Sequence, residues 1–283
     1  MEYRWFVDQV VEDQMHCYAI KKVLVDIVTP YQKVQIIENE TFGKCLIIDG
    51  KIQSAEKDEY IYHESLIHPA LILHNNPKKV LVIGAGEGAS LRELLKYEGV
   101  EITAIEIDPE VVYFSEKYLW DWHKGAFGDP RVNLVYQDGW DYIKNCRDQY
   151  DVIILDLPEP YPNTPAYRLY LSDFYKMVWE VLGEDGILVS QADTTQLGQE
   201  HRHFWIRDNL KQVFTNTYSY QTVIPSFDSN WGFLIAGKGD LNPFLSKEEL
   251  NNRIKTRIKK ELKFYDTESH LSLFYLPKYL RNS

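Results

Sequence analysis

From about residue 78 onward, short apolar runs alternate with stretches of helical spacing, and this alternation constrains the fold more than any other feature. The five apolar runs cover residues 79–83, 102–105, 132–135, 152–155 and 186–190. Such alternation predicts a mostly parallel, doubly wound α/β sheet. Two further runs, residues 218–224 and 232–236, are joined by a loop and predict an antiparallel edge.

The first sixty or so residues have a different pattern. Residues 23–28 and 33–38 are rich in β-branched side chains, and residues 45–48 lead into Asp49-Gly50, a dipeptide that favours a two-residue hairpin turn. This part of the chain predicts a small antiparallel β domain. We therefore divide the chain into an N-terminal β domain, residues 1–64, and an α/β domain, residues 65–283. The basic stretch 253–263 has helical spacing and is interpreted as a solvated face.

The chain carries 42 acidic and 31 basic residues, a net charge of −11. That balance disfavours nucleic acid as a partner and is weakly in favour of cations such as polyamines. No run approaches the roughly 18 apolar residues of a membrane helix, so we expect no membrane partner and a cytoplasmic location. Cys17, Cys45 and Cys146 are widely spaced, which fits neither a disulfide framework nor a zinc site.

The residues that follow the predicted strands form the candidate site, because a doubly wound sheet binds its ligand beyond the carboxyl ends of its strands. Gly84-Ala85-Gly86-Glu87-Gly88 follows the first strand, and Glu106 follows the second, about twenty residues later. Asp138-Gly139 follows the third strand and Asp156 the fourth. This pattern indicates an adenosine-type cofactor and fits dinucleotide enzymes and methyltransferases equally. Alternatively, the glycines only make a tight turn and Glu106 is a surface carboxylate.

Glu87 narrows the choice of ligand. A carboxylate inside a phosphate-binding loop would repel pyrophosphate, which argues against a dinucleotide. An inward-pointing Glu87 would also disfavour the carboxylate of S-adenosylmethionine, whereas the decarboxylated form presents only a sulfonium and an ammonium. The alternative is that Glu87 points outward and stabilises the start of the following helix.

A second pair of acids, Asp156 and Glu159, lies in a loop stiffened by several prolines, including Pro165. A primary ammonium has a pKa near ~10, so it must lose a proton before the resulting neutral amine can attack a sulfonium. Asp156 is a candidate acceptor for that proton, and Glu159 is a candidate partner for a further ammonium of the substrate. The alternative is an ordinary solvent-exposed loop.

Taken together, these motifs resemble those of the spermidine/spermine synthase family over nearly the whole chain. The matching segments are 58–64, 84–88, 106–108, 138–139, 156–160, 224–227, 231–233 and 276–280. The resemblance implies a Rossmann-like catalytic domain of the methyltransferase type after the β domain, and a homodimer or homotetramer. It also implies aminopropyl transfer from decarboxylated S-adenosylmethionine, a co-substrate, to a polyamine, with release of methylthioadenosine. No prosthetic group and no metal are expected.

The resemblance further implies roles for individual residues. Contacts to the nucleoside are implied for Gln32, Glu106, Asp138, Gly139 and Pro165. Donor binding by the glycine loop is implied for Gly84, Gly86, Glu87 and Gly88. Asp156 would accept the proton. The amine channel would be lined by Tyr62, His63 and Glu159, with Phe227 and Trp231 as further substrate-binding candidates. Without the resemblance, Tyr62 and His63 would be interpreted as packing between the two domains.

Several positions depart from the spermidine synthase pattern. Residues 62–71, Gly86-Glu87-Gly88, Asp156-Leu157 and Trp231-Gly232 look more like thermospermine synthase, which uses spermidine as its acceptor. Glu87 and Glu159 stand where the spermidine synthase pattern has aspartate, and Phe227 stands near its tyrosine. We therefore predict spermidine as the acceptor, with putrescine or agmatine as the alternative. A methyltransferase that uses intact S-adenosylmethionine and an inactive polyamine-binding homologue are more remote alternatives.

Overall fold

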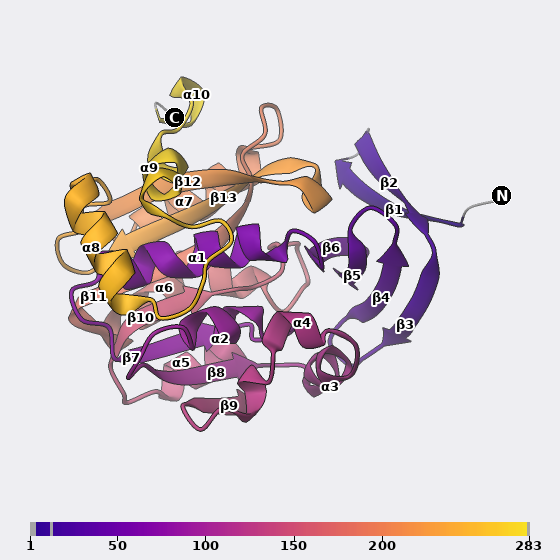
Figure 1. Ribbon diagram of the computed structural model, residues 1–283, viewed down its shortest axis with the longest axis horizontal. Helices are drawn as coiled ribbons and strands as arrows, with labels where there is room; N and C mark the ends of the chain where they lie inside the picture. The colour runs from indigo at the N-terminus through magenta and orange to yellow at the C-terminus, as the bar shows by residue number, and fades with distance from the viewer. Residues whose placement is uncertain (1–3, 12–13, 282–283) are drawn as a thin grey trace.

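The structure, a computed structural model, describes residues 4–11 and 14–281. Seven strands form the central sheet: β7 Lys79–Ile83, β8 Glu101–Glu106, β9 Val132–Tyr136, β10 Tyr150–Leu155, β11 Leu182–Thr194, β12 Asn216–Ile224 and β13 Ser229–Gly237. Their order across the sheet is β12-β13-β11-β10-β7-β8-β9. Strands β7 to β11 are parallel, and β13 and β12 are added antiparallel at one edge. The predicted Rossmann-like sheet with its antiparallel edge is confirmed (Figure 1).

Helices cover both faces of this sheet. Successive strand residues point to opposite sides, so each strand packs against helices on both faces. Val80 and Val82 pack with the first group of helices, α1 Glu59–Leu73, α2 Ala89–Leu94, α8 Lys247–Arg257 and α9 Thr267–Phe274. Leu81 and Ile83 pack with the second group, α5 Gly139–Asn145, α6 Ser172–Val181 and α7 His201–Lys211. Burial on both faces explains why these strands are continuous apolar runs. The remaining α-helices of the described residues are α3 Pro109–Tyr118, α4 Trp120–His123 and α10 Lys278–Arg281.

The N-terminal part contains two antiparallel pieces. Strands β3 Lys22–Val28, β4 Lys33–Asn39, β5 Gly43–Ile48 and β6 Lys51–Ala55 form the predicted small sheet. Asp49 and Gly50 have φ angles of 48° and 79°, as a two-residue hairpin turn requires, so the predicted turn is confirmed. Strands β1 Arg4–Val11 and β2 Gln14–Ile20 form a separate two-stranded ribbon that the sequence analysis did not identify. Its Trp5, Val7 and Met15 side chains are exposed, so apolar residues do not mark a buried face there.

Some boundaries differ from the prediction. Strand β11 extends from Leu182 to Thr194, well beyond the apolar run 186–190. The division predicted between residues 64 and 65 falls inside helix α1. The outermost residues of the two predicted domains, 1–3 and 282–283, lie outside the described residues. Among the helices that the structure describes, none has both the length and the apolar character needed to cross a membrane.

Helix α1 is a 15-residue helix that is buried along almost its whole length. Pro69 lies inside it and has no N–H to donate to the carbonyl of Ser65. The hydroxyl of Tyr220, on β12, donates to that carbonyl instead, at 3.0 Å. A neighbouring strand thus supplies the hydrogen bond that the proline removes.

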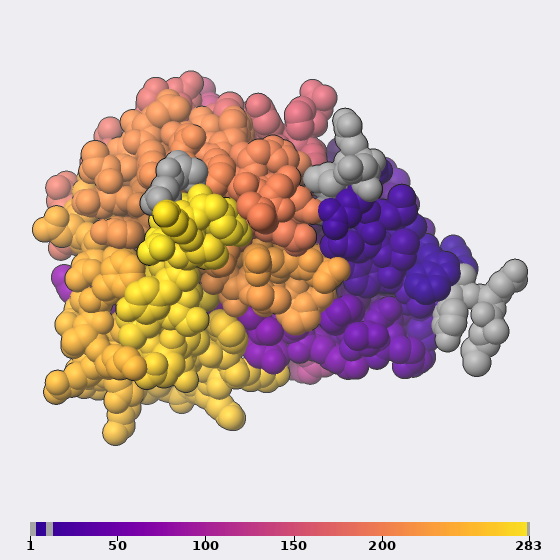
Figure 2. Space-filling model, turned by 90° about the horizontal axis from the view of Figure 1, so that it is seen from above, coloured from indigo at the N-terminus to yellow at the C-terminus, as the bar shows by residue number. Residues whose placement is uncertain are grey.

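The C-terminal end of α1 is held by helix α8. Arg257 donates to the carbonyls of Leu71, Ile72 and His74, and Arg253 donates to those of residues 72 and 73. The interpretation of residues 253–263 as a solvated face is therefore wrong for these two arginines, which satisfy the last carbonyls of a buried helix. In the space-filling view, the C-terminal helices lie on the face seen from above and the N-terminal β domain forms one end of the molecule (Figure 2).

Candidate active site

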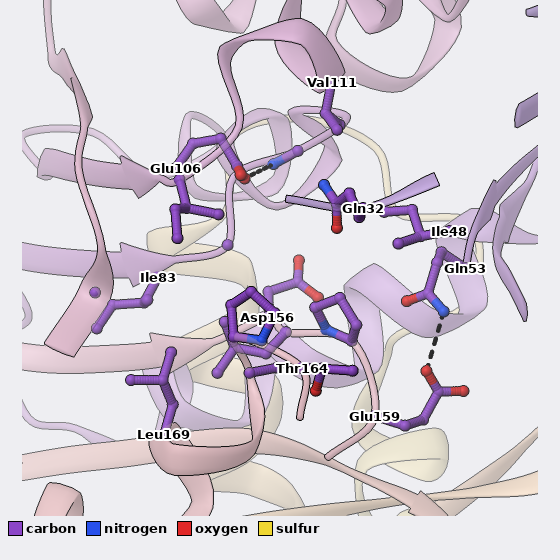
Figure 3. Close-up of a pocket in the computed structure, with 18 of the residues that line it drawn as sticks. Gln32, Ile48, Gln53, Ile83, Glu106, Val111, Asp156, Glu159, Thr164 and Leu169 are labelled. Carbon is purple, nitrogen blue, oxygen red and sulfur yellow. Dashed lines mark hydrogen bonds between the residues drawn. The ribbon is translucent and has the colours of Figure 1, made fainter. Parts of the chain in front are cut away.

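A pocket opens at the carboxyl ends of β7, β8 and β10, where the small N-terminal sheet faces the central sheet (Figure 3). Most of the predicted site residues line it: Gln32, Tyr62, Gly84, Gly86, Glu87, Glu106, Asp138, Gly139, Asp156, Glu159 and Pro165. Four others lie outside the lining: His63, Gly88, Phe227 and Trp231. The lining thus combines residues from segments more than a hundred positions apart.

The three glycines of the loop after β7 serve different purposes. Gly84 has a φ of +89°, and a Cβ there would lie 1.9 Å from the carbonyl oxygen of Asp156. Gly88, also at positive φ, packs against His123 and Phe127, away from the pocket. Gly86 differs from the other two, because a Cβ there would have Val111 as its nearest neighbour at 3.4 Å, an ordinary contact distance. Close approach of other parts of the protein, as well as of a ligand, therefore explains this glycine pattern.

Glu106 is buried beside the glycine loop and points into the pocket (Figure 3). Its Oε2 accepts hydrogen bonds from the backbone N–H groups of Ala85 and Gly86, at 3.1 and 3.0 Å, and its Oε1 accepts one from Asp108 at 2.9 Å. Burial outweighs these N–H groups and raises the pKa of Glu106 to about 7. A carboxylate held in this way can accept the two hydroxyls of a ribose.

Gln32 reaches this region from the loop between β3 and β4. Its Nε2 donates to Oδ2 of Asp108 at 3.0 Å, and the hydroxyl of Thr29 donates to the same oxygen at 2.8 Å. Asp108 also accepts a hydrogen bond from the N–H of Glu110, at the start of α3. These bonds fix the position of Gln32 relative to the central sheet.

Asp138 and Gly139 lie at the start of helix α5. Asp138 accepts the N–H of Trp140 at 2.8 Å through Oδ1 and pairs with Arg168 at 2.6 Å through Oδ2. A Cβ on Gly139 would lie 2.5 Å from Ile83, so the helix packs closely on the end of β7. Pro165 also lines the pocket.

Glu87 points inward, and the alternative in which it faces solvent is not observed. Its Oε1 lies 3.1 Å from Nε2 of His63, which is fully buried. On its other side, Nδ1 of His63 lies 2.9 Å from Oε2 of Glu59, and Arg92 donates to both oxygens of Glu59. Burial opposes the charge of His63, but the hydrogen bonds to Glu59 and Glu87 outweigh it and raise its pKa to about 10.

Asp156 follows β10 and faces the pocket centre. Its Oδ1 accepts the hydroxyl of Tyr62 at 2.8 Å, and its Oδ2 accepts the hydroxyl of Ser90 at 2.5 Å. Burial and the charge of Glu87 raise the pKa of Asp156 to about 6, although His63, Ser90 and Tyr62 act in the opposite direction. A carboxyl with this pKa is largely ionised at pH 8 and can accept a proton.

Glu159 lines the pocket beside Gln53 of β6. Its Oε2 accepts a hydrogen bond from Nε2 of Gln53 at 3.0 Å (Figure 3). Burial, and then the charge of Asp193, raise the pKa of Glu159 to about 7. Lys51, also in the lining, pairs with Asp8 of β1 at 2.9 Å.

Phe227 and Trp231 lie behind the pocket wall. The ring of Phe227 packs against Tyr62 and Trp231, with centroid distances of 6.1 and 4.8 Å. Phe227 thus supports Tyr62, which lines the pocket, and Trp231 packs against Phe227. The structure thus brings them close to the predicted site without placing them in its lining.

Sequence reasoning missed several residues that hold the predicted ones. Lys51 and Gln53 could have been found, because residues two apart on a strand share a face and Glu159 needs a partner. Ser90, Glu59 and Arg92 gave no such signal, since they come from two helices whose packing the sequence does not specify. Together these side chains fix the acids of the pocket in position.

The fold is Rossmann-like, and its pocket with several carboxyl groups suits a cationic ligand. Residues 59–247 match the family described as the spermine/spermidine synthase domain, and residues 4–56 match the spermidine synthase tetramerisation domain. The chain belongs to the spermine/spermidine synthase family and is an aminopropyltransferase. The resemblance inferred from the motifs is confirmed, and the tetramerisation match supports the predicted homo-oligomer.

Individual relatives match over nearly the full chain. Polyamine aminopropyltransferases of Sulfurisphaera tokodaii and Saccharolobus solfataricus are 43% and 44% identical, over 99% of this chain and 93% of each relative. A spermidine synthase in complex with the transition state analogue AdoDATO has a TM-score of 0.91 at 28% identity, covering 99% of this chain and 94% of that chain. Spermidine synthase from Thermotoga maritima has a TM-score of 0.90, with the same identity and coverage.

Proposed function

We propose that the protein transfers the aminopropyl group of decarboxylated S-adenosylmethionine to an amine of a polyamine and releases methylthioadenosine. The observation that carries this proposal is the convergence of Glu87, Glu106, Asp156 and Glu159 on one pocket. A pocket with four carboxyl groups favours cationic ligands and disfavours the carboxylate of intact S-adenosylmethionine. The AdoDATO complex of the similar spermidine synthase supports the same donor class.

In this proposal, one end of the pocket binds the nucleoside. Glu106 accepts the ribose hydroxyls, and the other nucleoside contacts come from Gln32, Asp138, Gly139 and Pro165. The glycine loop approaches the donor through its backbone. Glu87 binds the ammonium of the aminopropyl arm, since one of its oxygens faces the pocket.

The proposed reaction is an in-line displacement. The neutral amine attacks the methylene carbon attached to sulfur, a C–N bond forms, and the C–S bond breaks with its electron pair going to sulfur. Before this attack the ammonium of the acceptor gives up one proton to Asp156, which passes it to solvent, and the newly formed secondary amine keeps its remaining protons as an ammonium. Much of the rate enhancement would come from holding two mutually repelling cations in line between fixed carboxylates.

The residues at the acceptor end of the pocket bear on which polyamine is used. Tyr62 and Glu159 would bind the acceptor amine, with Glu159 opposite an ammonium beyond the attacking nitrogen. The motifs around Glu87 and Trp231 favour spermidine, whereas the similar solved structures are spermidine synthases, which keeps putrescine or agmatine as the alternative.

Other features are proposed on the same basis. The tetramerisation match favours a homotetramer over a homodimer, which analytical ultracentrifugation would distinguish. We also propose a cytoplasmic location and a reaction without a metal. The N-terminal β domain, residues 1–64, would form part of both the assembly and the pocket.

The direct test is an assay of the purified protein with decarboxylated S-adenosylmethionine against putrescine, agmatine, cadaverine, spermidine and norspermidine. We expect methylthioadenosine and an amine longer by one aminopropyl group, detected by mass spectrometry. A methylated amine formed from intact S-adenosylmethionine, with no methylthioadenosine, would contradict the proposal.

Replacing the proposed proton acceptor gives a sharper test. Asp156→Asn keeps the size of the side chain but cannot accept the proton, so we expect kcat to fall by about 10²- to 10⁴-fold, the usual contribution of general base catalysis. Decarboxylated S-adenosylmethionine should still bind, as isothermal titration calorimetry would measure. Unchanged turnover by Asp156→Asn would show that another group takes the proton.

A further inference from the structure

His63 is enclosed by acceptors on both sides of its ring. Nδ1 lies 2.7 Å from the carbonyl oxygen of Glu59 and 2.9 Å from Oε2 of the same residue. Nε2 lies 3.1 Å from Oε1 of Glu87. The side chain is fully buried, so water does not replace either partner.

This geometry dictates the protonation of the ring. A neutral imidazole has one N–H donor and one bare nitrogen acceptor. A carbonyl and an ionised carboxylate only accept, so both ring nitrogens must carry a proton to satisfy their partners. His63 is therefore an imidazolium as long as Glu87 is ionised.

The surrounding charges fit an imidazolium. Glu59 from α1 and Glu87 from the glycine loop supply two negative charges, and Arg92 from α2 forms a two-pronged pair with Glu59, at 2.9 and 2.8 Å. Asp156, at the end of β10, adds a third carboxylate nearby, and the ring of Tyr62 packs edge-on at 5.0 Å. Arg92 fixes Glu59, Glu59 fixes His63, and His63 in turn fixes Glu87.

Only one oxygen of Glu87, Oε1, takes part in this series of hydrogen bonds. None of the described residues donates a hydrogen bond to the other oxygen, Oε2, and the side chain is 15% exposed in the pocket wall. The imidazolium thus holds the carboxylate in one orientation and leaves Oε2 for a cation in the pocket. A buried His63 has no surface to offer a substrate directly.

We propose that His63 is a positioning residue that acts through Glu87: as an imidazolium it orients this carboxylate toward the ammonium of the aminopropyl donor. The positioning role rests on the donor proposed above, whereas the charge of the ring follows from its hydrogen-bond partners alone. Its effect belongs to donor binding rather than to acceptor binding, because Glu159, and not Glu87, lies at the acceptor end.

The charge of the ring can be measured on the unmodified protein. In ¹⁵N-histidine-labelled protein, we expect both nitrogens of His63 to remain protonated at pH 8, with the signal assigned by its loss in His63→Gln. The chain has eight histidines, so this assignment is practical. If His63→Gln does not fold, the signal is assigned by elimination, from single substitutions of the other histidines. A single protonated nitrogen of His63 at pH 8 would overturn the proposal, whatever the enzyme turns over.

The positioning role is tested with two matched variants. A glutamine can donate only from its amide nitrogen, so in His63→Gln one of the two carboxylates would face the amide oxygen. We expect the Kd for decarboxylated S-adenosylmethionine to rise about tenfold or more, since charge-assisted hydrogen bonds are among the strongest. The KM for the acceptor should stay within about twofold of its wild-type value, given that charge pairs couple mainly to direct partners.

His68→Gln is the control, since His68 is equally buried on the same helix and pairs with Glu93 at 3.0 Å and the hydroxyl of Tyr97 at 2.9 Å. Glu93 keeps Arg92 and Lys96 as partners in this variant. Equal donor affinity in His63→Gln and wild type would refute the positioning role. Failure of wild type to release methylthioadenosine with any amine would instead refute the proposed function.

Discussion

Three carboxyl groups of the pocket are held in surroundings that disfavour their charge. Burial is the largest cause for each, and it raises the pKa of Glu106, Asp156 and Glu159 to about 7, 6 and 7. A carboxyl whose pKa is raised by folding stabilises the protein at acidic pH, and this stability is lost as the pH rises through the raised value. The free protein therefore carries a cost at neutral pH that a bound cation would relieve.

Glu159→Gln tests this cost. The amide removes the buried charge and can still accept the hydrogen bond from Gln53 through its oxygen. At pH 8 we expect the variant to be more stable than wild type by up to about 3 kcal/mol, since the pKa of Glu159 rises from 4.5 to about 7 and each unit corresponds to about 1.4 kcal/mol. The advantage should vanish toward pH 4.5, as thermal unfolding across this range would record.

Glu184→Gln is the matched control, because its side chain is 94% exposed and should change stability little at either pH. A Glu159→Gln protein that is less stable than wild type at pH 8 would mean that the carboxylate is favourably paired in the free protein.

At the scale of elements, α1 connects the pocket to the opposite end of the sheet. Tyr62 and His63 in its first turns reach the site, and its last turn is held by Arg257 of α8. In Arg257→Met, several carbonyls of a buried helix end lose their donor. We expect a destabilisation of about 1 to 3 kcal/mol, the usual cost of leaving such groups unpaired.

Denaturant unfolding would measure this loss, and Lys255→Met, an exposed position on the same helix, provides the comparison. Similar stability of the two variants would show that water replaces Arg257 at the helix end.

The elements that could be predicted are those whose burial pattern is simple. Strands β7 and β10 are buried on both faces and stand out as apolar runs, and Asp49-Gly50 marks its hairpin directly. The β1–β2 ribbon escaped notice because its exposed apolar residues mask the alternation. In the site, Glu87, Glu106 and Asp156 follow strands and could be located, whereas Ser90 and Arg92 reach the site only through the packing of helix α2.

At the scale of the whole molecule, the pocket is shared between the N-terminal sheet and the central sheet. Thr29 and Gln32 on one side meet Asp108 on the other, and Gln53 meets Glu159. The geometry of the site therefore depends on how these two parts are held together.

Thr29→Val removes one of these cross-domain hydrogen bonds and keeps the shape of the side chain. The hydroxyl of Thr29 also accepts the backbone N–H of Gln32, so the variant loosens this loop as well. We expect the KM for the donor to rise about three- to tenfold with a smaller change in kcat, since a lost hydrogen bond is worth about 1 kcal/mol. Steady-state kinetics at saturating acceptor would check this, and an equal fall in kcat would place the defect in the chemical step.

Gly84 lacks a side chain to offer the reaction, yet its position has little tolerance for change. Because a Cβ there would lie 1.9 Å from the carbonyl oxygen of Asp156, even an alanine displaces the loop that carries the reacting acid. In a saturation-mutagenesis library grown without added product, in cells that need this enzyme to make the polyamine, substitutions at positions 84 and 156 would therefore be depleted to a similar extent. Such a library would thus mark as essential a residue that matters only because it has no side chain.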